Sequence, residues 1–365
     1  MNCKLWLVST MALLVGITFV TLAPAGGMPS TSGYTVLGPI RHGKLTIFPV
    51  VATRSFDTSE FITLDEGLRS GEVTVSESGG VLPLMRGRRV VPRDGAQVNQ
   101  LTLVNNSRRP LILLAGEIVT GGKQDRVIGK DRIIPAESDP VDLGVFCVEP
   151  GRWVGSSDKF GVVGVGNQNP TATMAAPEVR AKAMAAKDQQ QVWDEVAKTR
   201  SAMAGIVVPG PAAQAINGTT SYARVMDNQE VKQHVDSVAD PIRHDYQSLI
   251  QQLRDQKAVG VVVAVNGEIV WADVFASTGL LEKYWPKLVR SYAAEAVVSR
   301  VRSGDADVKR AQEFINQLDG RHETVDSEPG LYRHTEVSGD GFKAFELTSL
   351  LPKTGFAVHV AKMTE

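Results

Sequence analysis

The chain has 365 residues, 43% of them hydrophobic and 22% charged, which is typical of a globular protein and excludes a disordered one. The 39 basic and 40 acidic residues leave a formal net charge of −1, so nothing attracts the whole chain to nucleic acid or to an anionic membrane. We therefore expect no nucleic-acid partner. The length is sufficient for a large buried core in one or two domains.

The first 25 residues have the three parts of a cleavable secretory signal peptide. Lys4 gives a basic start, residues 5–22 are apolar, and Ala23-Pro24-Ala25 supplies small residues in an A-x-A arrangement. An uncleaved N-terminal membrane anchor is the alternative, because the apolar run approaches the roughly 20 residues of a spanning helix. We predict cleavage and a periplasmic or secreted protein, with no membrane span after the signal.

Cysteine content adds a constraint on the exported chain. Cys3 and Cys147 are the only cysteines, so cleavage would leave Cys147 without an internal disulfide partner. Stability would then depend on core packing. We interpret Cys147 as a buried, inert strand residue, since no histidine has a telling spacing to it and cysteine is commonly buried.

Residues 34–153 are expected to be rich in β-strand. Candidate strands occupy residues 45–51, 73–75, 101–104, 111–120 and 141–148, with turn signals at residues 121–122 and 129–131. Closely spaced strands with short turns favour an antiparallel meander or a sandwich.

Residues 154–220 are predicted to be a loop and helical excursion. Residues 154–172 suggest a long loop, in which Gly161, Gly164 and Gly166 lack the Gly-x-Gly-x-x-Gly order of a phosphate-binding loop. Pro177 stands where a first helical turn would begin, and residues 177–203 predict one or two helices.

Residues 221–365 predict an α+β region with long helices and a β-hairpin. A helix over residues 229–257 is expected to restart at Asp240-Pro241, and Asn266-Gly267 predicts a two-residue hairpin with a type I′ turn. A helix from residue 278 to about 302 is expected to be interrupted at Pro286. A short helix over 306–318 and strands at 331–337, 342–347 and 355–360 complete a chain of the α+β class.

The segment 117–153 concentrates carboxylates and arginines and is the best candidate for chemistry. Glu117 follows an apolar strand, where a carboxylate is costly unless it is paired, and Arg126 or Arg132 could pair with it. The candidate catalytic residues are Glu117, Asp131 and Glu149, and the candidate ligand-binding residues are Lys123, Gln124, Arg126, Arg152 and Trp153.

This segment has two interpretations. Converging acids and arginines would suit acid–base catalysis, metal-assisted hydrolysis or an arginine clamp on phosphate. The alternative is a structural ion-pair network that holds the strands together. An open pocket around the carboxylates would favour chemistry, whereas sealed salt bridges would argue against it.

Other patterns carry less weight. His234 and His244 are expected to share no helix face because Pro241 separates them, and no zinc-protease or serine-hydrolase motif is present. We therefore predict no metal site, and the sequence leaves the cofactor unknown. Arg86, Arg88, Arg89 and Arg93 form a basic group, interpreted as a solvated loop, with anion binding as the alternative.

Several segments together resemble the ARG and rhodanese-phosphatase-superfamily-associated protein domain, a largely uncharacterised prokaryotic family. They are residues 114–126 with Asp131 and Pro135, residues 145–153, residues 260–270, and Phe275 with residues 285–292. The resemblance spans roughly residues 34–362. The family name records an association with ADP-ribosylglycohydrolases and phosphatases, which implies a link to ADP-ribose or nucleotide chemistry but assigns no catalytic residue.

Two functional hypotheses follow. The first is an exported module that binds a small molecule or an envelope partner, since an export signal is present and a catalytic signature is absent. The second is a hydrolase that acts on a nucleotide or an ADP-ribose-like substrate through the acid and arginine residues of segment 117–153. A thiol or redox role of Cys147 is a third, weaker possibility. We favour the first hypothesis.

Overall fold

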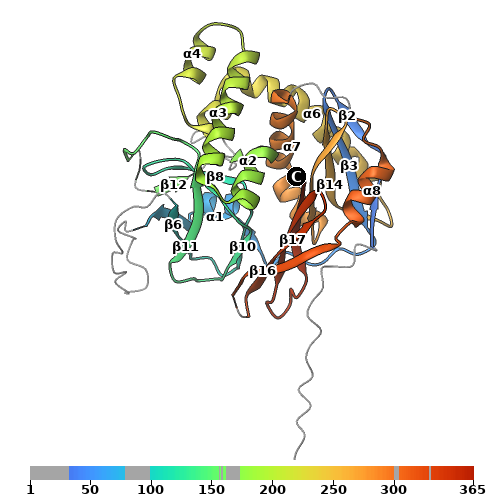
Figure 1. Ribbon diagram of the computed structural model, residues 1–365. Helices are drawn as coiled ribbons and strands as arrows, with labels where there is room; N and C mark the ends of the chain where they lie inside the picture. Colours follow the sequence, from blue (N-terminus) through green and yellow to red (C-terminus); the bar gives the residue numbers. More distant parts are fainter. Residues whose placement is uncertain are drawn as a thin grey trace, which may run out of the picture.

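The computed structural model describes residues 33–78, 99–155, 157, 159–161, 173–299, 304–328 and 330–365. The export signal predicted over residues 1–25 lies outside these ranges, as do the basic group at residues 86–93 and both Gly164 and Gly166. Figure 1 shows two β-rich parts with a layer of helices above and between them.

The larger β-rich part is a nine-stranded antiparallel sheet in the order β1-β3-β14-β15-β19-β18-β17-β16, with β2 paired to β3. Its strands are β1 (Tyr34–Val36), β2 (Ile40–His42), β3 (Leu45–Ala52), β14 (Lys257–Val265), β15 (Glu268–Phe275), β16 (Gly320–Glu328), β17 (Tyr332–Gly339), β18 (Phe342–Ser349) and β19 (Ala357–Thr364). The first strands of the N-terminal half therefore belong to the C-terminal sheet, because β3 pairs with β14 from end to end.

The hairpin between β14 and β15 confirms the predicted type I′ turn. Asn266 and Gly267 both have positive φ, at 52° and 78°, as this turn requires at its two central positions. A Cβ atom at position 267 would lie 2.1 Å from the Gly304 carbonyl oxygen, so glycine is needed there for close packing as well as for its conformation.

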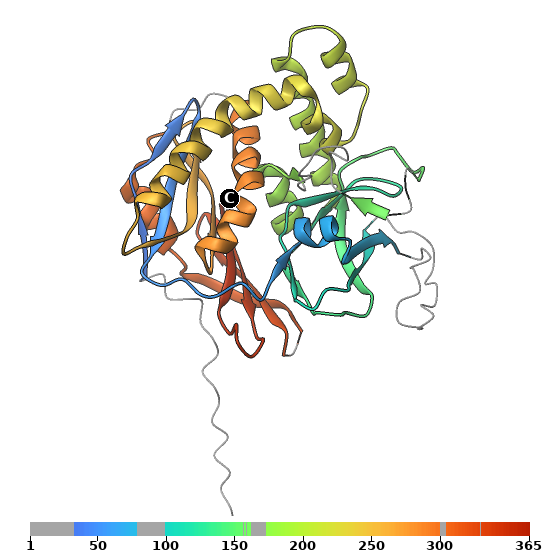
Figure 2. The same cartoon turned by 180° about the vertical axis from the view of Figure 1, so that it is seen from behind.

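Helices cover both faces of the nine-stranded sheet (Figure 2). Helices α6 (Gln229–Gln252) and α7 (Thr278–Val298) pack on one face against Ile47, Val261 and Val263. Helix α8 (Val308–Asn316) packs on the other, where β3 and β14 present Phe48 and Val262. Alternate strand residues thus face opposite helices, as the two-residue period of a strand requires.

Two prolines lie inside continuous helices. Pro241 is within α6 and Pro286 within α7, so the restart expected at residues 240–241 and the interruption expected at Pro286 are wrong. An interior proline costs about 3 kcal/mol, but burial of an apolar neighbour contributes about 1.5–3 kcal/mol per side chain. Ile242 beside Pro241, and Trp285 with Leu288 around Pro286, are buried in this way and keep the helices intact.

The second β-rich part is a closed antiparallel barrel of six strands. In ring order these are β5 (Val73–Glu77), β6 (Gln100–Asn105), β11 (Val141–Cys147), β9 (Arg126–Ile128), β8 (Glu117–Gly121) and β12 (Lys159–Gly161). The short strand β12 closes the ring because it pairs with both β5 and β8. The α+β class with a strand-rich N-terminal half is confirmed, although these strands close into a barrel where a meander or sandwich was expected.

The remaining elements connect the two parts. They are β4 (Ile62–Thr63), α1 (Leu64–Ser70), β7 (Leu111–Leu113), β10 (Arg132–Ile134), β13 (Thr173–Met174), α2 (Pro177–Ala181), the π-helical segment η2 (Lys182–Ala186), α3 (Gln189–Ile206), α4 (Pro211–Asn217) and α5 (Tyr222–Asp227). Pro177 begins α2, as predicted. Among the described residues, none of the helices has the length and apolarity needed to cross a bilayer.

Candidate functional site

Two of the three candidate catalytic carboxylates meet where the barrel joins the large sheet. The turn that leads into β8 donates the Leu114 N–H to Glu117 Oε2 at 2.8 Å and the Ala115 N–H to Asp131 Oδ1 at 2.7 Å. Both carboxylates are completely buried. Consecutive backbone amides therefore hold the two side chains in place.

Glu117 is neutralised by a lysine from the long helix α7. The Lys287 ammonium group bonds to Glu117 and, at 2.6 Å, to Asp65 of α1. Burial would lower the pKa of Lys287, but the two carboxylates raise it above its usual value, so the lysine stays charged. The expected pairing of Glu117 with Arg126 or Arg132 is wrong, because Arg132 bonds to Glu328 at 2.7 Å and Arg126 lies inside the barrel.

Asp131 belongs to a second buried chain of charges. Its Oδ2 lies 2.5 Å from His359 Nδ1, and His359 Nε2 lies 3.1 Å from Asp273 Oδ1. Arg180 donates two hydrogen bonds to Asp273, at 2.9 and 3.0 Å. Burial alone would lower the pKa of His359, but the flanking aspartates raise it to about 9, so the imidazole is protonated at neutral pH.

These contacts seal Glu117 and Asp131 into salt bridges. Neither lines the cleft described below, and the cations that hold them come from α7 and β19, far away in the sequence. The arrangement matches the structural ion-pair interpretation of these two residues.

Glu149 has a different set of partners at one end of the barrel. It accepts hydrogen bonds from Arg152 Nη2 at 2.6 Å and from the Asp125 N–H at 3.0 Å, and its carbonyl accepts one from Gln124 Nε2 at 3.2 Å. The structure therefore does not bring Glu149 together with Glu117 and Asp131. The structure does bring candidate ligand-binding residues together at this end of the barrel, where the Lys123 ammonium lies 4.9 Å from the centre of the Trp153 ring.

Cys147 is buried in β11 and forms no disulfide. Burial raises the pKa of its thiol above the usual value, so the nucleophilic thiolate is disfavoured. Within the described ranges, no group of three or more His, Cys, Asp or Glu side chains is placed to hold a metal ion. His234 and His244 do share the continuous helix α6, contrary to expectation, but they are ten residues apart, which separates them by about 15 Å along the helix axis.

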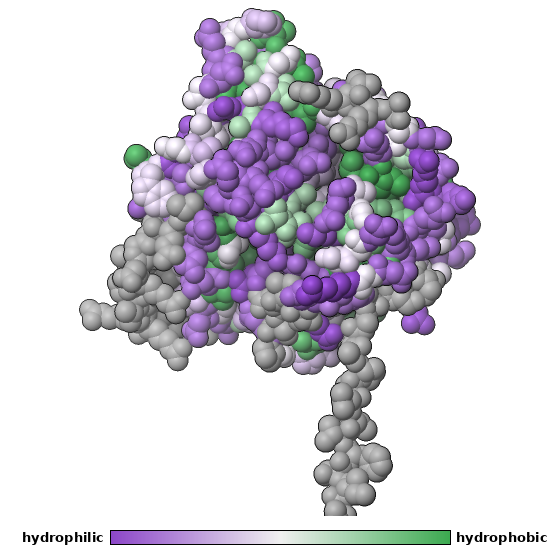
Figure 3. All heavy atoms as spheres, viewed as in Figure 1, coloured by the Kyte–Doolittle hydropathy of each residue, from purple (hydrophilic) through white to green (hydrophobic). Residues whose placement is uncertain are grey.

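A cleft of about 1120 Å³ opens between α3, α7 and the β14–β15 hairpin. Figure 3 shows this face of the molecule, where hydrophobic surface is bordered by hydrophilic side chains. Among the described residues that line it, the carboxylates are Glu178, Glu195, Glu268, Glu295 and Glu365, against Lys198 as the one lysine, and the apolar wall is Val265, Ile269, Val270 and Val298. The cleft is therefore acidic on one side and apolar on the other.

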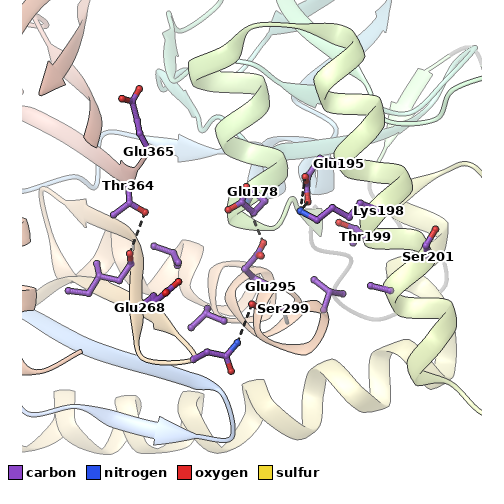
Figure 4. A pocket seen from close by; sticks show the side chains of 16 residues that line it. Glu178, Glu195, Lys198, Thr199, Ser201, Glu268, Glu295, Ser299, Thr364 and Glu365 are labelled. Atoms are coloured by element: carbon purple, nitrogen blue, oxygen red, sulfur yellow. Dashed lines mark hydrogen bonds and ion pairs between the residues drawn. The ribbon is translucent and has the colours of Figure 1, made fainter. Parts of the chain in front are cut away.

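Glu295 of α7 is the unusual group in this cleft (Figure 4). One carboxylate oxygen accepts a hydrogen bond from the Glu178 N–H at 3.2 Å, and no cation among the described residues forms an ion pair with it. Lys198 pairs with Glu195, at 3.1 Å. Burial and the neighbouring Glu178 carboxylate raise the pKa of Glu295 to about 7.

Sequence reasoning missed this cleft because its walls come from five separate segments. The only local signal was Glu178, directly after the helix-starting Pro177. Nothing in the pattern of α7 distinguishes Glu295 from a surface glutamate.

The barrel, the nine-stranded sheet and the cleft between helices and hairpin define a mixed α+β protein with a ligand-sized cavity. The sequence model of the ARG and rhodanese-phosphatase-superfamily-associated protein domain matches residues 33–363, and the chain belongs to this family. No curated protein and no solved structure matches the chain.

Proposed function

We propose that the chain is an exported, non-catalytic binding protein that takes a small organic amine in the acidic cleft. One observation carries this proposal: Glu295 places a largely buried carboxyl group in the cleft and forms no ion pair with a described residue, since the nearby Lys198 pairs with Glu195. A buried carboxylate is unfavourable without a counter-charge. A bound ammonium group would supply that charge.

The other walls of the cleft support the same ligand class. Val265, Ile269 and Val298 offer apolar surface to the carbon chain of an amine. The volume of the cleft, about 1120 Å³, is slightly above the range of about 300–1,000 Å³ that is usual for small-molecule sites. Polar groups on one side and apolar groups on the other are the usual composition of such sites.

A hydrolase that acts on a nucleotide or an ADP-ribose-like substrate has less support. Glu117 and Asp131 are sealed into the core, and Glu149 is held by Arg152. The family name records an association and not an activity. Export agrees with a binding role, since an envelope protein meets free solutes without intracellular cofactors.

Glu295→Gln is expected to weaken amine binding at least tenfold, about 1.4 kcal/mol, because it removes the carboxylate that pairs with the ammonium group. Titration calorimetry with 1,5-diaminopentane at pH 8 measures the effect. For the wild type, affinity should rise between pH 6 and pH 8, because Glu295 loses its proton near pH 7 while the amine stays protonated.

Glu282→Gln is the matched control, because Glu282 is an exposed glutamate on the same helix. It should bind the diamine as the wild type does. The proposal fails if the wild type binds no amine, or if Glu295→Gln binds as tightly as the wild type.

A further inference from the structure

A buried arginine occupies one end of the six-stranded barrel. Arg126 of β9 lies opposite Val119 of β8 and opposite Cys147 of β11. Residues paired in this way point to the same side of a sheet, and Val119 belongs to the apolar interior of the barrel. The Arg126 side chain therefore projects into the barrel, where it is completely buried.

The guanidinium group of Arg126 is incompletely bonded. Nη1 reaches the Asp125 carbonyl oxygen at 3.4 Å, but Nε and Nη2 have no hydrogen-bond partner among the described residues. These two nitrogens form the side-on fork with which arginine binds a carboxylate or phosphate in bidentate fashion. Burial lowers the pKa of Arg126 from its usual value, yet arginine remains charged in proteins.

Unpartnered polar atoms concentrate at this end of the barrel. Thirteen buried side-chain nitrogen and oxygen atoms of the described residues lack a partner, and five of them belong to Glu77, Gln124, Arg126 and Arg152. Native proteins pair nearly all buried polar groups, so such a concentration marks a place where a ligand completes the hydrogen bonding. The set contains donors and acceptors, since Glu77 Oε2 and Gln124 Oε1 are among the atoms.

The surrounding turn is tightly constructed. A Cβ atom at Gly122 would lie 2.3 Å from the Phe160 ring and 2.6 Å from Glu77 Oε1, and the Lys123 N–H donates to that same oxygen at 2.6 Å. Arg152 donates to the carbonyl groups of Gly121 and Gly122, at 3.3 and 3.0 Å. The turn thus seats Glu77 and Arg152 at fixed positions beside the barrel end.

We propose that this barrel end binds a small hydroxyl-bearing anion, with a phosphate or carboxylate group on the Arg126 fork and a hydroxyl group donating to Glu77. The site is separate from the acidic cleft and takes a ligand of opposite charge. Because the Arg126 guanidinium is fully buried, the ligand reaches it only when the turn opens, so association should be slower than diffusion allows.

The test uses the full chain and four probes: glucose 6-phosphate, glucuronate, inorganic phosphate and neutral glucose. After long incubation, thermal shift and calorimetry should show binding of the first two, weaker binding of phosphate and none of glucose. Binding of glucose 6-phosphate alone would assign the anion as phosphate, and binding of glucuronate alone would assign it as carboxylate.

Arg126→Met should lower the affinity for the anion by a factor of about 30 or more. Arg126→Lys should lower it about tenfold, since a lysine offers a point charge in place of the fork. Arg243→Met is the control, because Arg243 is an arginine on α6 paired with Asp240 at the surface, and it should bind normally. Should Arg126→Met fail to fold, Glu77→Gln tests the other half of the site: it should weaken glucose 6-phosphate more than inorganic phosphate. Failure of the wild type to bind any anion, or unchanged binding by Arg126→Lys and Glu77→Gln together, would overturn the proposal.

Discussion

Arg180→Met is expected to lower the free energy of unfolding by about 3–5 kcal/mol, the usual cost of breaking a buried ion pair from one side. Arg180 and Asp273 are both fully buried and share two hydrogen bonds. The guanidinium group also lies 4.4 Å from the centre of the Trp271 ring. Its loss leaves the Asp273 carboxylate in the core with His359 and Tyr292 as its remaining partners among the described residues.

Urea denaturation followed by circular dichroism measures this loss. Lys187→Met is the matched control, because the Lys187–Glu336 pair is exposed and such pairs contribute about 0–1 kcal/mol. A loss below about 1 kcal/mol in Arg180→Met would show that the pair contributes no more than a surface salt bridge.

Lys287→Met is expected to have a similarly large effect, about 3–5 kcal/mol at pH 7. Lys287 is the cation that neutralises both Glu117 and Asp65, and all three are buried. Burial already raises the pKa of Glu117 even with the lysine present. Without the lysine, the carboxylate would take up a proton more readily, so the destabilisation should shrink as the pH falls from 7 to 5.

The matched control is Lys283→Met, one turn earlier on α7, where the lysine pairs with Glu66 and both are partly exposed. It should lose no more than about 1 kcal/mol. Adding Glu117→Gln to Lys287→Met should recover part of the stability, since it removes one uncompensated charge. A double variant that is less stable than Lys287→Met would contradict the assignment.

Local signals in the sequence predicted the local structure well. Asn266-Gly267 specified its hairpin because both central positions of a type I′ turn need positive φ, and Pro177 specified a helix start because its ring fixes φ and its missing N–H is not needed there. The prolines inside α6 and α7 misled the prediction, because tertiary packing outweighed a local penalty.

The sequence pattern could not predict which distant segments pair as strands. The β3–β14 pairing joins residues 45–52 to residues 257–265, and β12, which closes the barrel, has only three residues in a glycine-rich stretch. Neither periodicity nor turn signals specify such partners, because register depends on what else the sheet must bury.

In the candidate site, too, local signals were predictable and distant partners were not. The apolar strand ending in Glu117 indicated a buried carboxylate that needs a partner, and Glu117 does have one. The partner, Lys287, is 170 residues away on α7, a helix that no local pattern linked to segment 117–153. Glu295 was missed for the same reason, since its raised pKa arises from burial against α2 and not from its neighbours in sequence.

The charge pairs at the junction also determine how the chain can be divided. The barrel segment supplies Glu117 and Asp131, whereas α7 and β19 supply Lys287 and His359. A fragment ending at residue 153 would carry both acids without their cations and would lack β12, which closes the ring. We therefore expect the barrel and the nine-stranded sheet to fold and unfold as one cooperative unit, and the chain to reach a stable state only once β19 is in place.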